Sequence, residues 1–137
     1  MITSDHGSTY IGNIDPNDHK RFQIPLLFWG PAINKQFEGK SIDQIGNSFD
    51  IPATILTLLN INFQNYSFSR NLLYVYQKQR AYWITEHTLG WINEDRKIVI
   101  NHDTEKLYFN TGSNENISIS IREAMLHFKL CANYVLK

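Results

Sequence analysis

The sequence contains little cysteine and no excess of charge of either sign. Its single cysteine, Cys131, excludes an internal disulfide bond, and its place in an apolar stretch is typical of a small buried side chain. Basic and acidic residues number 13 each, so the formal net charge is zero. Proteins that bind nucleic acids or anionic membranes normally carry a basic excess. We therefore expect no nucleic-acid partner.

Long apolar runs are also absent. No run approaches the roughly 20 residues that a helix needs to span a bilayer, and the longest, residues 24–29, has the length of a strand. Residues 3–8 are polar, and no basic segment followed by an apolar run opens the chain, as it would in a signal peptide. We expect neither a signal peptide nor a membrane-spanning segment within this sequence.

The chain nevertheless has enough apolar side chains to bury one core. It has 137 residues, of which 42% are hydrophobic and 13% aromatic, and this size and composition are typical of one folded domain. Residues 22–29 (FQIPLLFW), closed by Gly30 and Pro31, predict a buried strand. Because proline donates no ladder hydrogen bond, Pro25 is expected at the start of that strand or facing an unpaired side.

The remaining patterns predict two helices and a meander. Apolar residues at helical spacing predict a helix over residues 48–60, capped by Ser48 or Asp50, and a closing helix over residues 117–136. Between them, aromatic and β-branched residues alternate, which favours antiparallel strands at residues 81–85, within 91–100 and at 106–109. Taken alone, the chain is expected to have an α+β appearance.

The tripeptide Asp5-His6-Gly7 carries the most chemistry in the sequence. It follows residues that read as the end of a strand, so the carboxylate and the imidazole can turn toward one metal ion. Oxygen and nitrogen ligands together suit Zn²⁺ or Mn²⁺, and glycine lets the backbone turn sharply. The alternative is a turn that contains a hydrogen-bonded histidine, and an Asp-His pair alone does not exclude it.

His19 is the second candidate for a functional residue. It lies in a polar loop just before the apolar residues 22–29, so it could face the same pocket as Asp5 and His6. Its spacing alone also fits an exposed loop histidine. The neighbouring Asp15 and Asp18 have the character of turn residues rather than ligands.

Other catalytic patterns are missing. The sequence has no G-x-S-x-G nucleophile elbow and no glycine-rich phosphate loop. His87, His102 and His127 show no ligand spacing, so we expect surface or core roles for them.

The order of the segments resembles a known family. The C-terminal part of a sulfatase-like catalytic domain of the alkaline phosphatase superfamily shows a similar order, over residues 2–73 of this chain. Within that superfamily the sequence is most similar to the phosphoglycerol and phosphoethanolamine transferases, the group that includes lipoteichoic acid synthase. The similarity rests on ITSDHG (2–7), IPLLFWGP (24–31), NSFDIPATILTLL (47–59) and RNLL (70–73).

The resemblance implies a fold and roles for matched positions. It implies the C-terminal portion of an α/β/α sandwich, followed by an antiparallel meander and a closing helix, with residues 1–137 forming one partial domain. Asp5 and His6 correspond to metal ligands, and His19 to a catalytic histidine near the bound phosphate or sulfate group. Asp50 belongs to a motif that begins a structural helix, so it is not expected to be catalytic.

The sequence departs from the family pattern at two places. Ser8 stands where sulfatases usually carry an acidic residue, and Arg70 and Asn71 occupy a stretch that normally includes a glycine. Both departures weaken a strict sulfatase interpretation more than a transferase interpretation.

The resemblance also implies that part of the catalytic machinery precedes Asp5. Such enzymes need a Thr, Ser or formylglycine nucleophile and further acidic ligands, and a catalytic Zn²⁺ site uses about three protein ligands. We therefore expect this chain alone to be inactive, with the divalent metal, Zn²⁺ or Mn²⁺, held by the intact enzyme and not necessarily by this part. The strand at residues 22–29 would have an open edge, which is compatible with self-association.

The expected function is that of a C-terminal fragment of a metal-dependent phosphoglycerol or phosphoethanolamine transferase or of a sulfatase-like hydrolase. Its substrate would be a phospholipid-type molecule or another phosphate or sulfate ester. Because the relatives act outside the cytoplasmic membrane, the resemblance implies an extracytoplasmic, membrane-anchored protein. The alternative is a non-catalytic binding or assembly module derived from such an enzyme.

Overall fold

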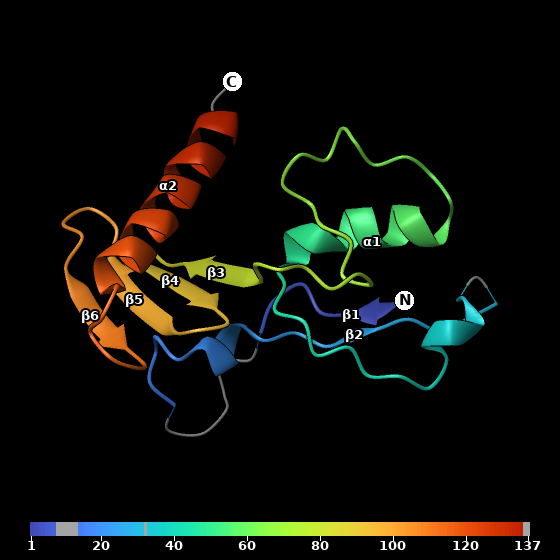
Figure 1. Ribbon diagram of the computed structural model, residues 1–137, viewed down its shortest axis with the longest axis horizontal. Helices are drawn as coiled ribbons and strands as arrows, with labels where there is room; N and C mark the ends of the chain where they lie inside the picture. Colours follow the sequence, from blue (N-terminus) through green and yellow to red (C-terminus); the bar gives the residue numbers. More distant parts are fainter. Residues whose placement is uncertain (8–13, 32, 136–137) are drawn as a thin grey trace.

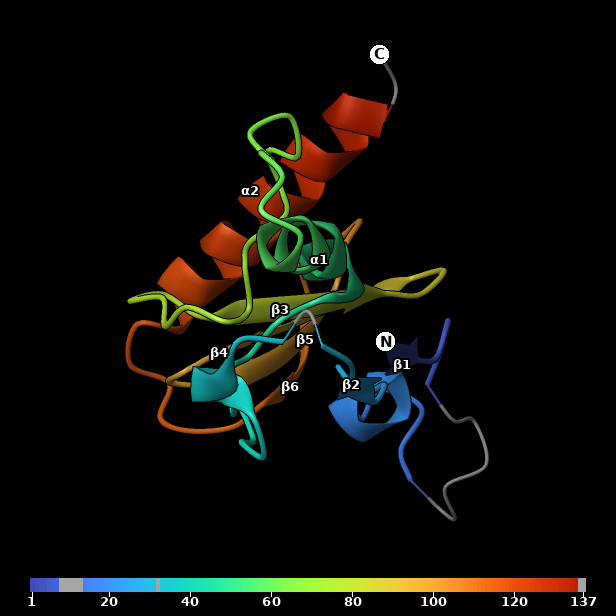
Figure 2. The same ribbon diagram turned by 90° about the vertical axis from the view of Figure 1, so that its right-hand side faces the viewer.

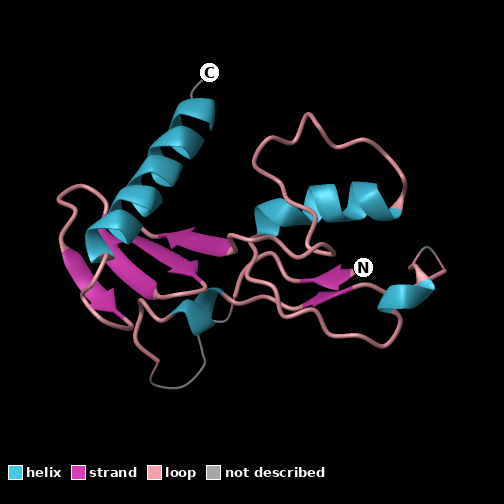
Figure 3. Ribbon diagram, viewed as in Figure 1, coloured by secondary structure: helices cyan, strands magenta, loops and turns pink. Residues whose placement is uncertain are grey.

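A four-stranded antiparallel meander supplies most of the buried core (Figures 1 and 3). The computed structural model describes residues 1–7, 14–31 and 33–135, so the departure at Ser8 lies outside the described residues. The strands follow one another across the sheet in chain order, which confirms the predicted meander: β3 (Arg80–Ile84), β4 (Thr88–Asn93), β5 (Lys97–Asn101) and β6 (Leu107–Asn110).

The long helix α2 (Ile117–Val135) confirms the predicted closing helix, and it covers one face of this sheet. Alternate residues of the two central strands point toward it because side chains along a strand alternate between its faces. They pack against the small side chain of Ala124 and the flexible side chain of Met125. The core residues that the strands contribute are Leu89, Trp91, Ile98 and Ile100.

The opposite face of the sheet is covered by the short 3-10 helix η1 (His19–Phe22), and Figure 2 shows η1 and α2 on different sides of the sheet. The ring of Phe22 stacks on the indole of Trp83 with a centroid separation of 5.2 Å. The indole in turn lies directly on Gly90 of the neighbouring strand, where a methyl group would overlap it. The sheet therefore lies between α2 and the segment that carries His19.

The helix predicted over residues 48–60 begins with the 3-10 turn η3 (Ser48–Asp50) and continues as α1 (Ile51–Leu58), with Pro52 in its first turn. Asp50 occupies the N-cap position of α1, one of the two predicted, but its side chain makes no capping hydrogen bond to that helix. Its carboxylate is bound by an arginine instead. A further 3-10 turn, η2 (Lys35–Phe37), interrupts the polar stretch before η3.

The predicted buried strand over residues 22–29 is wrong. Only β2 (Leu26–Leu27) is a strand, and it pairs antiparallel with β1 (Ile2–Thr3) in a ribbon of two strands. Leu27 is 55% exposed and Trp29 is 86% exposed. An isolated pair of short strands cannot bury both of its faces. Ile24, Leu26 and Phe28 are half-buried, whereas the alternate residues Leu27 and Trp29 face outward.

The fold is thus a mixed α/β structure with antiparallel sheets and a C-terminal helix, consistent with part of a sulfatase-like α/β fold. In the described part of the chain, no helix combines the length and apolar character needed to cross a membrane.

We predict that Ile100→Ala lowers the free energy of unfolding by about 2–5 kcal/mol, because it leaves a cavity beneath α2. Ile100 is fully buried, whereas Ile84 at the end of β3 is 45% exposed. The control Ile84→Ala should cost less than about 1 kcal/mol. Urea unfolding followed by tryptophan fluorescence measures both variants, and equal losses would contradict the placement of β5 in the core.

Candidate functional site

The predicted metal ligands Asp5 and His6 lie side by side after β1. Their Oδ1 and Nε2 atoms are 3.7 Å apart, and both side chains are largely exposed. The Nδ1 atom of His6 lies 2.7 Å from the carbonyl oxygen of Gly7 and donates to it. This hydrogen bond selects the tautomer with its proton on Nδ1, in which the lone pair of Nε2 lies beside the carboxylate of Asp5. Metal-binding histidines commonly show this arrangement, with one nitrogen held by a carbonyl group.

Gly7 brings this loop against the segment that carries His19. A methyl group built on Gly7 would overlap the carbonyl oxygen of Arg21 and crowd the α-carbon of Phe22. Only a residue without a β-carbon allows such a close approach of two backbones. The Asp5-His6-Gly7 loop therefore packs on η1.

Both ring nitrogens of His19 are engaged by charged neighbours. Nδ1 lies 2.9 Å from the Asp18 carboxylate and donates to it, while Nε2 accepts a hydrogen bond of 3.0 Å from the Nζ atom of Lys97 on β5. Burial and the charge of Lys97 lower the pKa of His19 below its usual value, against the opposing effect of Asp18. The ring is therefore neutral, and it joins η1 to the sheet.

These predicted site residues do not converge on one centre. Within residues 1–7, 14–31 and 33–135, no three His, Cys, Asp or Glu side chains are grouped closely enough to hold a metal ion. Asp5 and His6 form a pair of donors, and His19 is hydrogen-bonded elsewhere. The role predicted for each of these residues remains a prediction.

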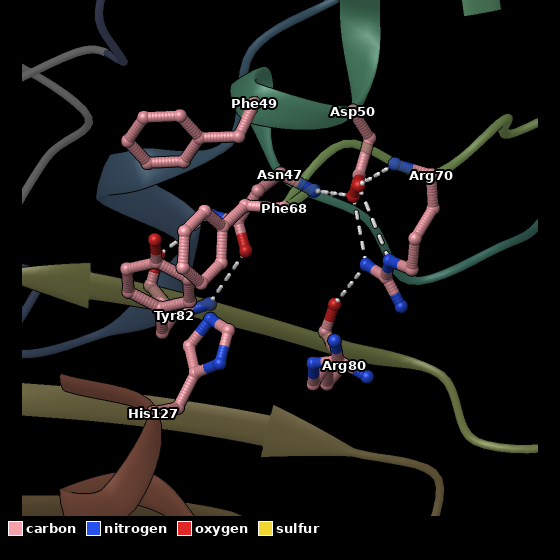
Figure 4. Close-up of a pocket in the computed structure, with 8 residues that line it drawn as sticks. All are labelled: Asn47, Phe49, Asp50, Phe68, Arg70, Arg80, Tyr82 and His127. Atoms are coloured by element: carbon pink, nitrogen blue, oxygen red, sulfur yellow. Dashed lines mark hydrogen bonds and ion pairs between the residues drawn. The ribbon is translucent and has the colours of Figure 1, made fainter. Parts of the chain in front are cut away.

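A second polar cluster forms where α1 meets the sheet (Figure 4). Asp50 is 1% exposed, and its carboxylate receives the Arg70 guanidinium through two hydrogen bonds, Nε to Oδ1 at 3.1 Å and Nη2 to Oδ2 at 2.7 Å. The same carboxylate accepts the backbone N–H groups of Asn47 and Arg70, at 2.9 and 2.8 Å. A buried carboxylate needs such partners because burial strips it of water.

The cluster also ties the α1 segment to strand β3. Arg70 donates from Nη2 to the backbone carbonyl of Arg80 at 2.7 Å. The Asn47 side-chain amide donates to the carbonyl of Tyr82 at 2.7 Å and accepts from its N–H at 3.0 Å. These bonds join residues far apart in the chain and make the cluster a junction between two parts of the fold.

Residues from both sides of this junction line a small pocket. Its polar side chains belong to Asn47, Asp50, Arg70, Arg80, Tyr82 and His127. The aromatic rings of Phe49 and Phe68 complete the lining. Figure 4 shows His127 entering from α2 and Arg80 lying below the Asp50–Arg70 pair.

Charge in this pocket is unevenly balanced. Burial, together with repulsion from Arg70, lowers the pKa of the Arg80 guanidinium. Burial and the same two arginines lower the pKa of His127, so its ring is neutral. Burial and the Cys131 thiol raise the pKa of Tyr82, whose phenol also stays neutral. Asp50 is therefore the single anion of the pocket, opposite two arginines.

Sequence reasoning overlooked this pocket. Arg70 was noticed only as part of a segment compared with the family, with no role assigned to it, and His127 was predicted to have a surface or core role. Arg80 belongs to β3, Asp50 precedes α1 and His127 lies on α2. No local spacing could have grouped them, because their proximity arises from the packing of α1 and α2 around one strand.

Comparison with known families gives one match. Residues 1–61 match the Sulfatase family, which is less than half of the chain. No curated protein and no solved structure gives a significant match. The matched part includes Asp5, His6 and Asp50, and it supports a sulfatase-like relationship within the alkaline phosphatase superfamily. Arg70, Arg80 and all of the meander lie beyond it.

We predict that Asp50→Asn lowers the free energy of unfolding by about 3–5 kcal/mol, because it leaves the buried Arg70 without its counter-charge. The matched control is Asp103→Asn, since the Asp103 carboxylate also lies against a basic side chain, that of His102, but is itself 67% exposed. An exposed pair contributes less than about 1 kcal/mol. Thermal and urea unfolding measure both variants, and a loss of about 1 kcal/mol or less in Asp50→Asn would show that the pair is not buried in solution.

A second prediction concerns pH. Because the pKa of His19 is lower in the folded than in the unfolded chain, the unfolded state binds more protons at mildly acid pH. The free energy of unfolding should therefore fall as the pH drops through the ordinary histidine value of about 6.5. His127, whose pKa is also lowered, adds to this fall.

The variant His19→Gln should make this fall shallower, because glutamine does not titrate and its amide oxygen can still accept from Lys97. The control is His87→Gln, whose ring is 68% exposed and whose replacement should leave the slope unchanged. Urea unfolding at a series of pH values, from about 7.5 to about 5.5, gives the slope for each protein. Identical slopes for His19→Gln and the unmodified chain would refute the prediction.

Proposed function

We propose that this chain supplies part of a metal-dependent centre that transfers or hydrolyses a phosphate or sulfate ester group. One observation carries the proposal: the part of the chain that matches the Sulfatase family contains an Asp5–His6 pair whose Nε2 and carboxylate lie together, 3.7 Å apart. The hydrogen bond from His6 Nδ1 to the Gly7 carbonyl leaves Nε2 available as a ligand. Carboxylate oxygen and imidazole nitrogen suit Zn²⁺ or Mn²⁺.

The pair fits a metal ion as two ligands of a larger set. Asp5 and His6 would hold it, and a bound divalent ion would polarise the ester oxygens as a Lewis acid. Since the described residues group no third donor with them, the proposed centre is completed by groups from another segment or subunit. We accordingly propose that residues 1–137 are inactive on their own.

His19 is proposed to act near the transferred group. Its neutral ring accepts from Lys97 Nζ and donates to Asp18, so the pair of His19 and Lys97 brings a positive charge to η1. The loop with Asp5 and His6 packs on this same helix through Gly7. A cation next to a neutral imidazole is suited to stabilising an anionic group or to passing a proton to a leaving oxygen.

The finer assignment is also a proposal. Among sulfatase-like enzymes we favour phosphoglycerol or phosphoethanolamine transfer, with a phospholipid-type substrate and an extracytoplasmic, membrane-anchored protein. The resemblance of residues 2–73 to that group supports this assignment. Arg70 and Asn71 also support it, because their departure from the sulfatase pattern weakens a sulfatase interpretation more than a transferase interpretation. We further propose that the exposed β1–β2 ribbon, with Leu27 at 55% exposure, permits self-association.

We predict that the chain binds Zn²⁺ and Mn²⁺ weakly in solution and that Asp5→Ala and His6→Ala each weaken this binding about tenfold or more, as expected for loss of a ligand. Isothermal titration calorimetry measures the affinity. The matched control is the pair Glu86–His87, which is also adjacent and exposed, with its Nε2 and Oε1 atoms 3.8 Å apart. Glu86→Ala and His87→Ala should not change the binding.

Three outcomes would contradict the proposal. Equal losses at the two pairs, or no metal binding at all, would favour a binding or assembly module derived from such an enzyme. Hydrolysis of a phosphodiester or an aryl sulfate by the purified chain, at a rate that depends on Asp5, would overturn the inference that the centre is incomplete.

A further inference from the structure

We propose that the pocket at the junction of α1 and β3 binds a doubly charged oxyanion, a phosphate or sulfate group, through Arg80 and Arg70. This site is separate from the Asp5–His6 pair and does not rest on the proposed function. The inference starts from the pocket's charge: two guanidinium groups and one carboxylate line it. Asp50 is bonded through both of its oxygens to Arg70, so it leaves Arg80 uncompensated.

Arg80 is the positively charged residue of the pocket that has no partner among the described residues. Its side chain is partly buried, yet among the described residues its guanidinium forms no hydrogen bond or ion pair. Arginine side chains that lose water are normally paired with an anion. Arg80 lines the pocket, and no acceptor among the described residues binds the N–H donors of its guanidinium.

Arg70 adds donors beside Arg80. Its Nε and Nη2 atoms bind Asp50, and Nη2 also binds the Arg80 carbonyl. The remaining nitrogen, Nη1, takes no part in these bonds, and Figure 4 shows it on the side of the guanidinium away from Asp50. Because the Asp50 pairing holds this guanidinium in place, its free N–H groups are pre-oriented, which reduces the entropy lost when a ligand binds.

The other groups facing the pocket do not supply the missing negative charge. The ring of His127 contacts Tyr82 at a centroid distance of 4.7 Å, and both side chains are neutral. The Asn47 amide is used by the backbone of Tyr82. Cys131, next in line behind Tyr82, lies 3.5 Å from its hydroxyl group and does not line the pocket.

The nature of the ligand follows from charge and size. The charges of Asp50, Arg70 and Arg80 sum to plus one, so the pocket suits an anion. Donors from two guanidinium groups match the several oxygens of phosphate or sulfate better than the two oxygens of a carboxylate. Because the pocket is small, terminal oxygens enter while the remainder of the ligand stays outside, beside the rings of Phe49 and Phe68. A free ion and the end of an ester present the same terminal oxygens.

The test is a titration of the 137-residue chain with sodium phosphate, sodium sulfate and sodium acetate at constant ionic strength, followed by ¹H–¹⁵N NMR. Phosphate and sulfate should give saturable shifts at Asn47, Arg70, Arg80 and Tyr82, and acetate should bind about tenfold more weakly or not at all. A monoester such as glycerol phosphate, titrated in parallel, distinguishes an ester group from the free ion. Shifts confined to exposed lysines, or equal affinity for acetate, would overturn the proposal.

Substitutions sharpen this test. Arg80→Gln should weaken phosphate binding about tenfold or more, because it removes a charged donor, while Arg80→Lys should weaken it less by keeping the charge but losing the planar fork. The control Arg122→Gln changes an exposed arginine of α2 and should bind like the unmodified chain. Circular dichroism checks folding, and if Arg80→Gln does not fold, Arg80→Lys decides. Unchanged affinity in the folded Arg80 variants would refute the site, whatever the result of the metal titration.

Discussion

The fold depends on one buried carboxylate, whose negative charge has to be paired with a positive charge. Asp50 is almost fully buried, and Arg70, 20 residues further along the chain, binds both of its oxygens. Breaking such a pair strands a charge where water cannot reach it, so the two segments are held together by the cost of separating them. Through the Arg80 carbonyl the same arginine reaches strand β3. One ion pair thus joins the segment that resembles sulfatases to a meander beyond the family match.

The parts of the fold that the sequence predicted are those stabilised by nearby residues. The meander and α2 were predicted because alternating or helical apolar spacing matches the surface that each element buries, as Ile98 and Ile100 do under α2. The strand at residues 22–29 failed for the opposite reason. A buried strand requires cover on both faces, but the described residues leave the face with Leu27 and Trp29 exposed, and only Leu26 and Leu27 pair with β1. Apolar character predicts that a segment seeks burial, but it does not identify a partner.

The functional residues show the same difference between what nearby residues determine and what distant contacts determine. Asp5 and His6 could be recognised in the sequence because they are neighbours. The contact of His19 with Lys97 joins residues 78 positions apart, and no sequence pattern near either residue predicts it. Asp50 was correctly assigned to the start of a helix, but its partner was not foreseen. The state of Arg80 could not be foreseen either, since an arginine is buried or solvated, paired or unpaired, only in the folded chain.

The bonds that Asn47 and Arg70 make to β3 have a consequence for how the sheet meets other chains. A strand at the edge of a sheet offers free N–H and C=O groups that any extended peptide can extend into a further strand. On β3, the outward-facing N–H and C=O groups of Tyr82 are hydrogen-bonded to the Asn47 amide. The carbonyl group of Arg80 is hydrogen-bonded to the Arg70 guanidinium. Side chains thus stand in for a fifth strand on that side. Growth of this sheet by strand addition is directed to β6, at the opposite border.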